Sequence, residues 1–440
     1  MIFMISAWGI YILEKFVIDG GISLKGEIDI NGAKNAAVAI IPATLLATGP
    51  CILNNLPNIS DVSISFSILR KMGANIRLIN KHSAEIDTTN VVDPTVPYEL
   101  AKRMRASYYF LGALLARFGR ANVAMPGGCN FGVRPINLHL KGFNSLGAEY
   151  KIDGGMIRVV GRELKGTQIY FDVVSVGATI NILLAATKAK GMTIIENAAR
   201  EPHIVDLANF LNSIGANIMG AGTNVIKIKG TEHFGCSNYS IIPDQIEAGT
   251  YMAMAAATHG DVLIKNIIPK HLESIINKLR AMGVDIDDYD DNIRVRCNSS
   301  LKKVNVTTQP HPGFPTDMQP QITALLTLAE GTSIVTEGIW DSRFKYVDEL
   351  RRMGANISVD GKVAVVEGTN FLTGAPITAT DLRAGAAMII CALAAKGTTE
   401  IENIQFIERG YGDIVNKLKS LGAKIKRVGI PDNIKLQTAL

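Results

Sequence analysis

Leu69-Arg-Lys-Met-Gly73-Ala-Asn-Ile76 is the stretch of this 440-residue sequence that decides its fold, because five related stretches occur elsewhere. They are Phe143-Asn-Ser-Leu-Gly147-Ala, Leu211-Asn-Ser-Ile-Gly215-Ala, Leu279-Arg-Ala-Met-Gly283-Val, Leu350-Arg-Arg-Met-Gly354-Ala and Leu418-Lys-Ser-Leu-Gly422-Ala. The six glycines are 74, 68, 68, 71 and 68 residues apart, so the repeated unit is too long for a solenoid. Each stretch predicts a helix that ends with glycine at C′ and is followed by a strand.

The helices upstream of these stretches are apolar on nearly all sides, as in the segment 384–395. Such helices are buried, which predicts an inside-out α/β arrangement with the helices inside and the strands around them. Six units exceed what one hydrophobic core accommodates, so we expect two lobes of three units each. Residues 1–33 together with 243–440 are expected to form the first lobe, and residues 34–242 the second.

The composition is that of an ordinary globular protein, with 47% hydrophobic and 19% charged residues. A net charge of +5 without a basic block argues against a nucleic-acid partner and favours a small anion. The apolar opening segment 1–13 is too short to span a bilayer, so no membrane insertion is expected. Five scattered cysteines without a CxxC pair predict neither disulfides nor a metal site, and they favour the cytoplasm.

A glycine-rich stretch places a thiol near a cation: Met125-Pro-Gly-Gly-Cys129-Asn-Phe-Gly-Val-Arg134-Pro135. A thiol has a reference pKa of about 8.5, and a nearby guanidinium can tune it into a proton donor or a nucleophile near neutral pH. The stretch therefore suggests a reactive loop that carries Cys129. Taken alone, it fits a surface turn with an idle cysteine equally well.

Aligning the six units places polar and charged residues at two recurrent positions. The first position, at the start of the apolar helix, holds Lys34, Asn35, Arg103, Arg105, Ser175, Gln245, Asp317 and Arg383. The second, after the following strand, holds the Cys129 loop with Arg134, and then Arg200, Lys270, Arg343 and Arg409. Helix N-termini that carry arginine and lysine make an anion site, so we expect the two lobes to face each other across a charged cleft.

Several of these residues also have ordinary structural interpretations. Lys34 is an exposed first-turn lysine in one interpretation, but a cation there opposes the helix dipole, which favours a ligand role. Asp317, Asp244 and Asp381 each precede a helix, where aspartate is a favoured cap. His139 is the histidine nearest the Cys129 loop, and a hydrogen-bonding role fits it as well as a catalytic one.

The motifs together resemble the enolpyruvyl transferases from about Ile22 to Arg427. The resemblance rests on Asn31-Gly-Ala-Lys-Asn-Ala36, Met104-Arg-Ala-Ser107, the segment 126–135, Val174-Ser-Val-Gly-Ala-Thr179, Ala199-Arg-Glu-Pro202, Phe314-Pro-Thr-Asp-Met-Gln319, Asp381-Leu-Arg-Ala-Gly385 and Glu408-Arg-Gly-Tyr411. It implies a two-lobed inside-out α/β barrel of six βαβαββ repeats with internal helices. It also implies transfer of the enolpyruvyl group of phosphoenolpyruvate to the 3′-hydroxyl of UDP-N-acetylglucosamine, with release of phosphate, without a cofactor or a metal.

The resemblance also implies roles for individual residues. Cys129 would protonate the methylene carbon of phosphoenolpyruvate, and Asp317 would take the proton from the attacking hydroxyl. Cations would neutralise the substrate anion: Lys34, Arg134 and Arg409, with Arg343 and Arg383 nearby. The substrate-binding positions would be Asn35, Arg105, Arg134, Pro135, Ile136, Asn137, Leu138, Ser175, Val176, Gly177, Asp317 and Ile339.

The sequence departs from the family pattern mainly on the nucleotide side. Val173, His203, Gln245, Asp341 and Lys345 stand where lysine, glutamate, arginine, glutamate and histidine are common. Because Val173 donates no hydrogen bond, we expect a weaker or differently arranged contact to the diphosphate. Two other functions stay open: the sister reaction on shikimate 3-phosphate, which Lys34-Asn35 and Cys129 disfavour, and a non-catalytic paralogue that binds the sugar nucleotide.

Overall fold

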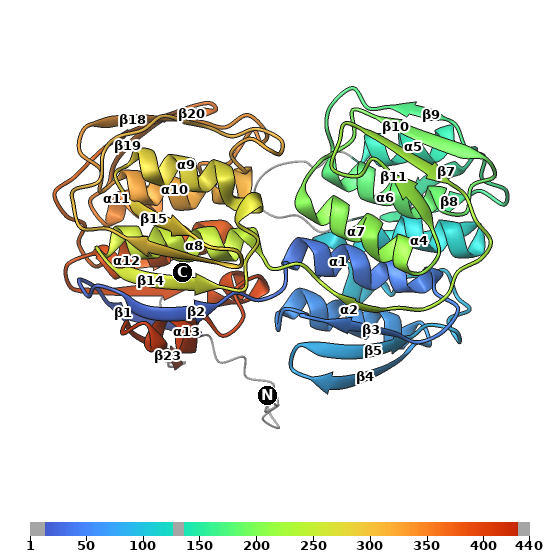
Figure 1. Cartoon of the computed structure of the whole chain (residues 1–440), viewed down its shortest axis with the longest axis horizontal. Helices are drawn as coiled ribbons and strands as arrows, with labels where there is room; N and C mark the ends of the chain where they lie inside the picture. Colours follow the sequence, from blue (N-terminus) through green and yellow to red (C-terminus); the bar gives the residue numbers. More distant parts are fainter. Residues whose placement is uncertain (1–13, 126–135, 430–440) are drawn as a thin grey trace.

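The computed structural model describes residues 14–125 and 136–429, which form the two lobes seen side by side in Figure 1. One hydrophobic core draws its buried residues from positions 33–241. The other combines positions 16–30 with positions 246–425. We propose that the domain boundaries lie at 33/34 and 242/243, and these separate cores support that division.

The second lobe contains three units. The first consists of α1 (Lys34–Ala43), η1 (Thr44–Leu46), β3 (Cys51–Asn54), α2 (Ser60–Lys71), β4 (Asn75–Asn80), β5 (Ser83–Asp87) and β13 (Asn238–Ser240). The next consists of α3 (Tyr98–Ala101), η2 (Arg105–Tyr108), α4 (Tyr109–Phe118), β6 (Arg120–Ala124), α5 (Asn137–Ser145), β7 (Glu149–Asp153) and β8 (Met156–Val160). The last consists of β9 (Gln168–Tyr170), α6 (Val176–Ala186), β10 (Met192–Glu196), α7 (Pro202–Ser213), β11 (Asn217–Met219) and β12 (Val225–Lys229).

The first lobe repeats the plan. Its first unit consists of β2 (Lys25–Asp29), α8 (Gln245–Ala257), β14 (Asp261–Lys265), η3 (Pro269–Leu272), α9 (Glu273–Ala281), β15 (Asp285–Asp288) and β16 (Asn292–Arg296). The next consists of β17 (Val306–Thr307), η4 (Thr316–Met318), α10 (Gln319–Leu326), β18 (Thr332–Thr336), α11 (Val347–Arg352), β19 (Asn356–Asp360) and β20 (Val363–Glu367). The last consists of β21 (Pro376–Thr378), α12 (Leu382–Ala394), β22 (Thr398–Glu402), η5 (Ile404–Arg409), α13 (Ile414–Ser420), β23 (Lys424–Gly429) and β1 (Glu14–Asp19).

Each unit builds one sheet, and three sheets contain a strand from a distant part of the chain. β1 lies between β22 and β23 and is antiparallel to both. β13 extends β3 in parallel, and β2 pairs in parallel with β14 although the second lobe separates them in sequence. The predicted α/β class with six repeats is confirmed. Within the described ranges the six sheets stay open, so they surround the helices without closing into a barrel.

The apolar helices lie inside each lobe, as predicted from their composition. In the second lobe, α4 packs against α1 and α6. In the first lobe, α8, α10 and α12 pack against one another, and every residue of α8 except Gln245 is buried. Because the helices are enclosed by sheets, only their ends reach the surface of a lobe, and these ends carry the polar residues.

The six repeated glycines end helices as predicted. Each has a positive φ, between +89° and +113°. In every copy the amide of the residue after the glycine donates to the carbonyl oxygen five residues earlier, as Ala74 does to Leu69 at 2.9 Å. This is the Schellman arrangement, which satisfies carbonyl groups at a helix end.

Two of these glycines separate the cost of a positive φ from the cost of a steric clash. Gly422 has φ +91° and open space where a Cβ would lie, whereas a Cβ on Gly215, at φ +113°, would lie 2.6 Å from the carbonyl oxygen of His233. We expect Gly422→Ala to lower the free energy of unfolding by about 1 kcal/mol, the cost of the left-handed conformation. Gly215→Ala is expected to cost about 2–4 kcal/mol because the backbone must also move. Equal losses in urea unfolding would contradict this explanation.

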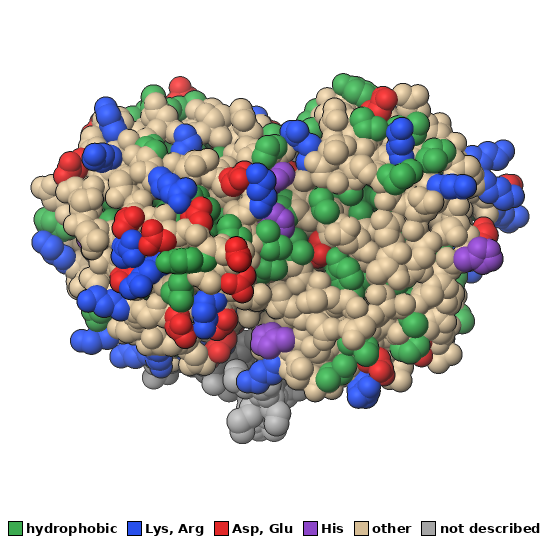
Figure 2. All heavy atoms as spheres, in the orientation of Figure 1, with side chains coloured by type: hydrophobic (Ala, Val, Ile, Leu, Met, Phe, Trp, Pro, Cys, Tyr) green, Lys and Arg blue, Asp and Glu red, His purple; other side chains and the backbone are tan. Residues whose placement is uncertain are grey.

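The face in Figure 2 shows Lys and Arg side chains interspersed with Asp and Glu over the first lobe, and a notch between the lobes at the upper edge. A surface of mixed charge lacks the single-sign field that nucleic-acid binding uses. No helix within residues 14–125 and 136–429 has the length and apolarity needed to cross a membrane.

Candidate active site

The candidate site is built on the starts of internal helices. Lys34 is the first residue of α1, Asp317 lies in η4 directly before α10, and Arg383 is the second residue of α12. The start of α1 reaches the first lobe, because the amide of Lys34 donates to Asp244 Oδ2 at 3.0 Å. The site therefore lies where the lobes meet, with α1 at the junction in Figure 1.

Lys34 and Arg409 share a buried carboxylate, that of Asp61 in the first turn of α2. Lys34 Nζ is 2.7 Å from Asp61 Oδ2 and donates to the carbonyl oxygen of Arg409 at 2.8 Å. Arg409 Nε donates to Asp61 Oδ1 at 3.1 Å. Because Lys34 and Asp61 belong to the second lobe and Arg409 to the first, this triad joins the two lobes.

The charges of this triad depend on one another. Burial raises the pKa of Asp61, but Lys34 and then Arg409 outweigh burial and hold the pKa below its usual value. Burial lowers the pKa of Lys34, which Asp61 opposes and Arg409 reinforces. Asp61 is only 2% exposed, so this carboxylate is a fixed counter-charge for both cations.

Asp61→Asn is expected to lower the free energy of unfolding by about 3 kcal/mol at neutral pH, because it leaves two cations without their buried counter-charge. The folded pKa of Asp61 lies below its unfolded value. Its contribution is therefore complete above the unfolded pKa and is lost as the pH falls through the folded one. Urea unfolding of both proteins should show a difference that is largest near pH 7 and shrinks below about pH 4. An unchanged stability at pH 7 would contradict this role.

Asp317 lies between two arginines of its own lobe. Arg383 Nη2 donates to Asp317 Oδ2 at 2.9 Å, and Arg343 Nη2 is 3.6 Å from Oδ1. Arg343 also donates to the carbonyl oxygen of Thr316 at 3.0 Å, and Arg383 Nη1 donates to the hydroxyl of Tyr411 at 3.4 Å. The side chains of Arg343 and Arg383 are 2% and 5% exposed, whereas that of Asp317 is 31% exposed. The carboxylate is thus the accessible part of this cluster.

The arginines also set the ionisation of Asp317. Burial raises its pKa, but Arg383 and then Arg343 lower it far more, and a hydrogen bond from the Asn35 side chain adds to this effect. The pKa of Asp317 therefore lies well below its usual range. Since Asn35 follows Lys34 in α1, one helix start contacts both carboxylates, and the two clusters form one site.

The three aspartates that precede helices have different roles. Asp244 accepts from the amides of Ile246 and Glu247, and Asp381 accepts from those of Arg383 and Ala384. Both are helix caps, which was the structural interpretation of their positions. The side chain of Asp317 caps no helix and faces the arginines instead. This difference separates the candidate catalytic carboxylate from the two structural ones.

The start of α6 forms the nucleotide-side candidate region. Ser175 caps this helix by accepting from Ala178, so Val176 and Gly177 form its first turn. A Cβ on Gly177 would lie 2.8 Å from Cε1 of His139, so a larger residue does not fit here. Burial lowers the pKa of His139 to about 4, which keeps it neutral at pH 7. A neutral histidine is a hydrogen-bonding residue here, and its Nδ1 lies 2.8 Å from the side-chain nitrogen Nδ2 of Asn181.

The remaining predicted positions are placed as follows. Ile136 precedes α5, and Asn137 and Leu138 are its first residues, on the helix that carries His139 next to α6. Arg105 opens η2 and is half-buried. Val173, predicted to weaken the diphosphate contact, is 66% exposed. Cys129, Arg134 and Pro135 lie outside the described residues.

Ile339 is held close to Asp317 by a carboxylate that the sequence did not single out. Glu337, 1% exposed, accepts from the hydroxyl of Thr316 at 3.0 Å and from the amides of Ile339 and Trp340 at 2.9 and 3.1 Å. Thr316 is the neighbour of Asp317. The turn with Asp317 and the segment with Ile339 are therefore fixed to each other.

Sequence reasoning missed Asp61, Glu337 and Tyr411. Asp61 looks like an ordinary first-turn acid of α2, and its partner Arg409 is 348 residues away. Tyr411, whose hydroxyl contacts Arg383 and Thr250, lies within the motif Glu408-Arg-Gly-Tyr411 but looks like a core aromatic. The signal that could reveal such an acid appears only when the six units are superposed. It is a buried acid next to a position that holds a cation in other units.

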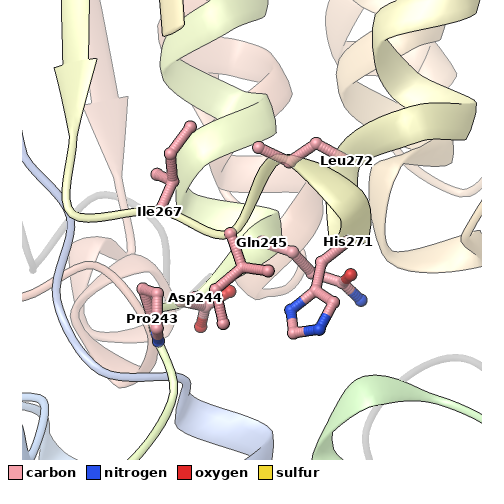
Figure 3. Close-up of a pocket in the computed structure, with 7 residues that line it drawn as sticks. Pro243, Asp244, Gln245, Ile267, His271 and Leu272 are labelled. Carbon is pink, nitrogen blue, oxygen red and sulfur yellow. The ribbon is translucent and has the colours of Figure 1, made fainter. Parts of the chain in front are cut away.

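A narrow hollow lies beside the site at the start of α8. It is lined by Pro243, Asp244, Gln245, Ile267, Ile268, His271 and Leu272 (Figure 3), and it leaves no room for a water-sized sphere. Ligand pockets usually enclose about 300–1,000 Å³, so this hollow is too small for a sugar nucleotide. In the part of the chain that the structure describes, no group of three or more His, Cys, Asp or Glu side chains is placed to hold a metal ion.

Comparison with known proteins agrees with this architecture. Residues 18–418 match the family described as EPSP synthase (3-phosphoshikimate 1-carboxyvinyltransferase). Among solved structures, the enolpyruvyl transferase NikO from Streptomyces tendae superposes with a TM-score of 0.87 at 26% identity, covering 96% of this chain and 100% of that one. EPSP synthase from Acinetobacter baumannii shares the fold, with a TM-score of 0.73 at 18% identity, covering 94% and 100%. The chain belongs to the enolpyruvyl transferase family.

Within this family, curated relatives that are more than half identical to this chain share one name. It is 56% identical over 416 residues to UDP-N-acetylglucosamine 1-carboxyvinyltransferase 3 of Caldanaerobacter subterraneus subsp. tengcongensis, covering 94% of this chain and 100% of the relative. It is 54% identical over 417 residues to UDP-N-acetylglucosamine 1-carboxyvinyltransferase of Clostridium botulinum, with the same coverage. The family and the transferase class predicted from the sequence are therefore confirmed.

Proposed function

We propose that this chain transfers the enolpyruvyl group of phosphoenolpyruvate to the 3′-hydroxyl of UDP-N-acetylglucosamine and releases phosphate, the first committed step of peptidoglycan synthesis. The observation that carries the proposal is the gathering of Lys34, Arg343, Arg383 and Arg409 around two carboxylates at the junction of the lobes. The names of relatives that share more than half of its residues favour this acceptor over shikimate 3-phosphate.

The reaction proceeds by addition and then elimination. In the addition, the 3′-hydroxyl gives its proton to Asp317 while its oxygen bonds to C2 of phosphoenolpyruvate, and Cys129 gives a proton to C3. The product is a tetrahedral intermediate with a methyl group. In the elimination, the methyl group gives a proton back to the Cys129 thiolate, the double bond forms again and the bond from C2 to the phosphate oxygen breaks. Inorganic phosphate leaves with that electron pair.

The cations suit the charge of this substrate. Phosphoenolpyruvate carries a phosphate and a carboxylate, and preorganised cations stabilise the charge that develops on such groups in the transition state. Lys34 and Arg409 come from different lobes and are tied by Asp61, so they can hold one anion between the lobes. Arg343 and Arg383 add a second pair of cations, and Arg134 is the fifth cation of the proposal.

We also propose a cytoplasmic location. The four described cysteines, Cys51, Cys236, Cys297 and Cys391, are all free thiols. Unpaired cysteines are typical of a reducing compartment. Roles in cell shape, the cell cycle and cell division follow from the proposed place in wall synthesis.

Phosphate release tests the proposed acceptor. Purified protein with phosphoenolpyruvate is supplied with either UDP-N-acetylglucosamine or shikimate 3-phosphate, and phosphate is measured over time. The proposal requires release that depends on the sugar nucleotide and stays at background with the shikimate. Release with shikimate 3-phosphate alone would overturn it.

Val173→Lys tests the nucleotide side of the proposal. A lysine, which is common in the family at this position, would bring a hydrogen-bond donor toward the proposed diphosphate position, and the exposed Val173 side chain leaves room for it. A charge-assisted hydrogen bond to phosphate is worth about 1.5–3 kcal/mol when well placed. We therefore expect the Michaelis constant for UDP-N-acetylglucosamine to fall about tenfold, with little change in kcat. An unchanged constant would argue against a weakened diphosphate contact.

A further inference from the structure

The two carboxylates of the site differ in one respect that decides what each can do. Asp61 is buried between Lys34 and Arg409, with 3% of its side chain exposed. Asp317 holds Arg383 and Arg343 in the same manner, but 31% of its side chain is exposed. The arginines behind it are almost fully enclosed. An incoming anion can therefore reach these two guanidinium groups from the side that Asp317 occupies.

We infer that Asp317 is a tethered anion that occupies Arg343 and Arg383 in the free protein, and that an anionic group of the substrate displaces it. The contacts of Asp317 with the two arginines are those a phosphate or carboxylate oxygen would make: one hydrogen bond of 2.9 Å from Arg383 and one approach of 3.6 Å to Arg343. No bond to carbon changes in this exchange; one carboxylate leaves the two guanidinium groups and one substrate anion takes its place. Asp61 remains in place because no open side leads to it.

The exchange has a chemical consequence that rests on the proposed function. While Asp317 is paired with two arginines, its pKa is far below the usual range, and a carboxylate of such low basicity is a poor acceptor for a hydroxyl proton. When the substrate anion takes over the arginines, the pKa of Asp317 returns toward its ordinary value. Binding of the anion thus prepares the proton acceptor, which fits a reaction in which phosphoenolpyruvate and the hydroxyl must react together.

The turn that carries Asp317 is anchored independently of the arginines. Glu337 fixes Thr316 through its hydroxyl, and Arg343 donates to the carbonyl oxygen of Thr316. Only the side chain of Asp317 therefore needs to rotate for the exchange, while the backbone keeps its position. Arg383 also keeps its contact with Tyr411, so both partners of the exchange remain in place.

Binding of anions to the free protein tests the inference. Calorimetric titration with inorganic phosphate and with phosphoenolpyruvate, without acceptor, is carried out on the wild type, Asp317→Asn and Asp317→Ala. Both variants should bind each anion about tenfold tighter than the wild type, since no carboxylate competes for the arginines. Turnover should nevertheless be lost. Affinity that is unchanged or lower in folded variants would overturn the inference.

A matched control separates displacement from a general effect of charge. Glu337→Gln removes a negative charge next to the same turn, but this carboxylate accepts from a hydroxyl and two amides. Its affinity for phosphate should stay within about twofold of the wild type. A gain as large as that of Asp317→Asn would overturn the inference, because any lost negative charge would then suffice.

A measurement on the wild type does not depend on how the variants fold. In a crystal structure with phosphate bound, Asp317 Oδ2 should lie beyond hydrogen-bond distance from Arg383, with a phosphate oxygen in its place. A separation that stays at 2.9 Å with phosphate on the arginines would overturn the exchange. Failure of the proposed function is distinguishable: displacement by phosphate without turnover of UDP-N-acetylglucosamine supports the exchange and rejects the acceptor.

Discussion

Cys129→Ala is expected to lower kcat by about 10³-fold while leaving the affinity for UDP-N-acetylglucosamine within twofold, because general acid catalysis contributes about 10²–10⁴-fold. Among the five cysteines, Cys129 alone lies in a motif on which the resemblance to the family rests. Its loss removes the proton donor for C3 but no group proposed to hold the sugar nucleotide. Steady-state kinetics together with calorimetric titration of the sugar nucleotide separate these two effects.

The other cysteines supply the controls. Cys51, Cys297 and Cys391 are buried, and burial raises the pKa of each thiol, so they are poor nucleophiles. Cys236 is exposed, which makes Cys236→Ala the matched variant, with full activity expected. An electrophilic phosphonate epoxide should label Cys129 only, as read by peptide mass spectrometry. Labelling of Cys236, or full activity of Cys129→Ala, would refute the assignment.

Lys34→Met is expected to lower kcat/KM for phosphoenolpyruvate by about 10³-fold, the effect of removing one preorganised group that stabilises developing charge. Methionine is one atom shorter than lysine and equally unbranched, so it keeps most of the apolar stem and loses the charge and the donors. The lost contacts are those to Asp61 and to the carbonyl oxygen of Arg409, so the link between the lobes weakens as well. Steady-state kinetics at varied phosphoenolpyruvate measures the loss.

Lys270 provides the control for Lys34. It is a lysine at the second recurrent position, the one that Arg409 holds in another unit, but its side chain is 78% exposed and pairs with Glu273 at 2.7 Å. An exposed ion pair contributes about 0–1 kcal/mol, so Lys270→Met should keep its activity within about twofold. Comparable losses in both variants would show that the loss of any lysine charge, and not the contacts at the junction of the lobes, determines the effect.

The repeat made much of the fold predictable. Six glycines at near-constant spacing marked the helix ends, and their positive φ angles confirm the turn that glycine favours there. The nearly all-apolar helices indicated that they lie inside. The strands with which β1 and β13 pair were not predictable. Each completes a sheet whose other strands are distant in sequence, and a strand carries no local signal of such a partner. Strand pairing is a tertiary property that short-range patterns do not encode.

The site was predictable where chemistry contradicts local preference. Lys34 opposes the dipole of its own helix, and this unfavourable placement indicated a ligand role for the lysine. In the structure the buried carboxylate of Asp61 compensates the charge of Lys34. Asp244, Asp317 and Asp381 look alike in sequence, since each precedes a helix. Only their contacts separate two caps from a carboxylate that faces arginines. Asp61 and Glu337 remained invisible because their partners are distant in sequence or are backbone amides.

Identification of the products from phosphoenolpyruvate and UDP-N-acetylglucosamine by ¹H and ³¹P NMR tests the proposed transfer most directly. We expect equal amounts of inorganic phosphate and of a sugar nucleotide with an enol ether on its 3′-oxygen, formed by the wild type and not by Cys129→Ala. A wild-type protein that binds the sugar nucleotide but forms neither product would contradict it and would favour a non-catalytic paralogue.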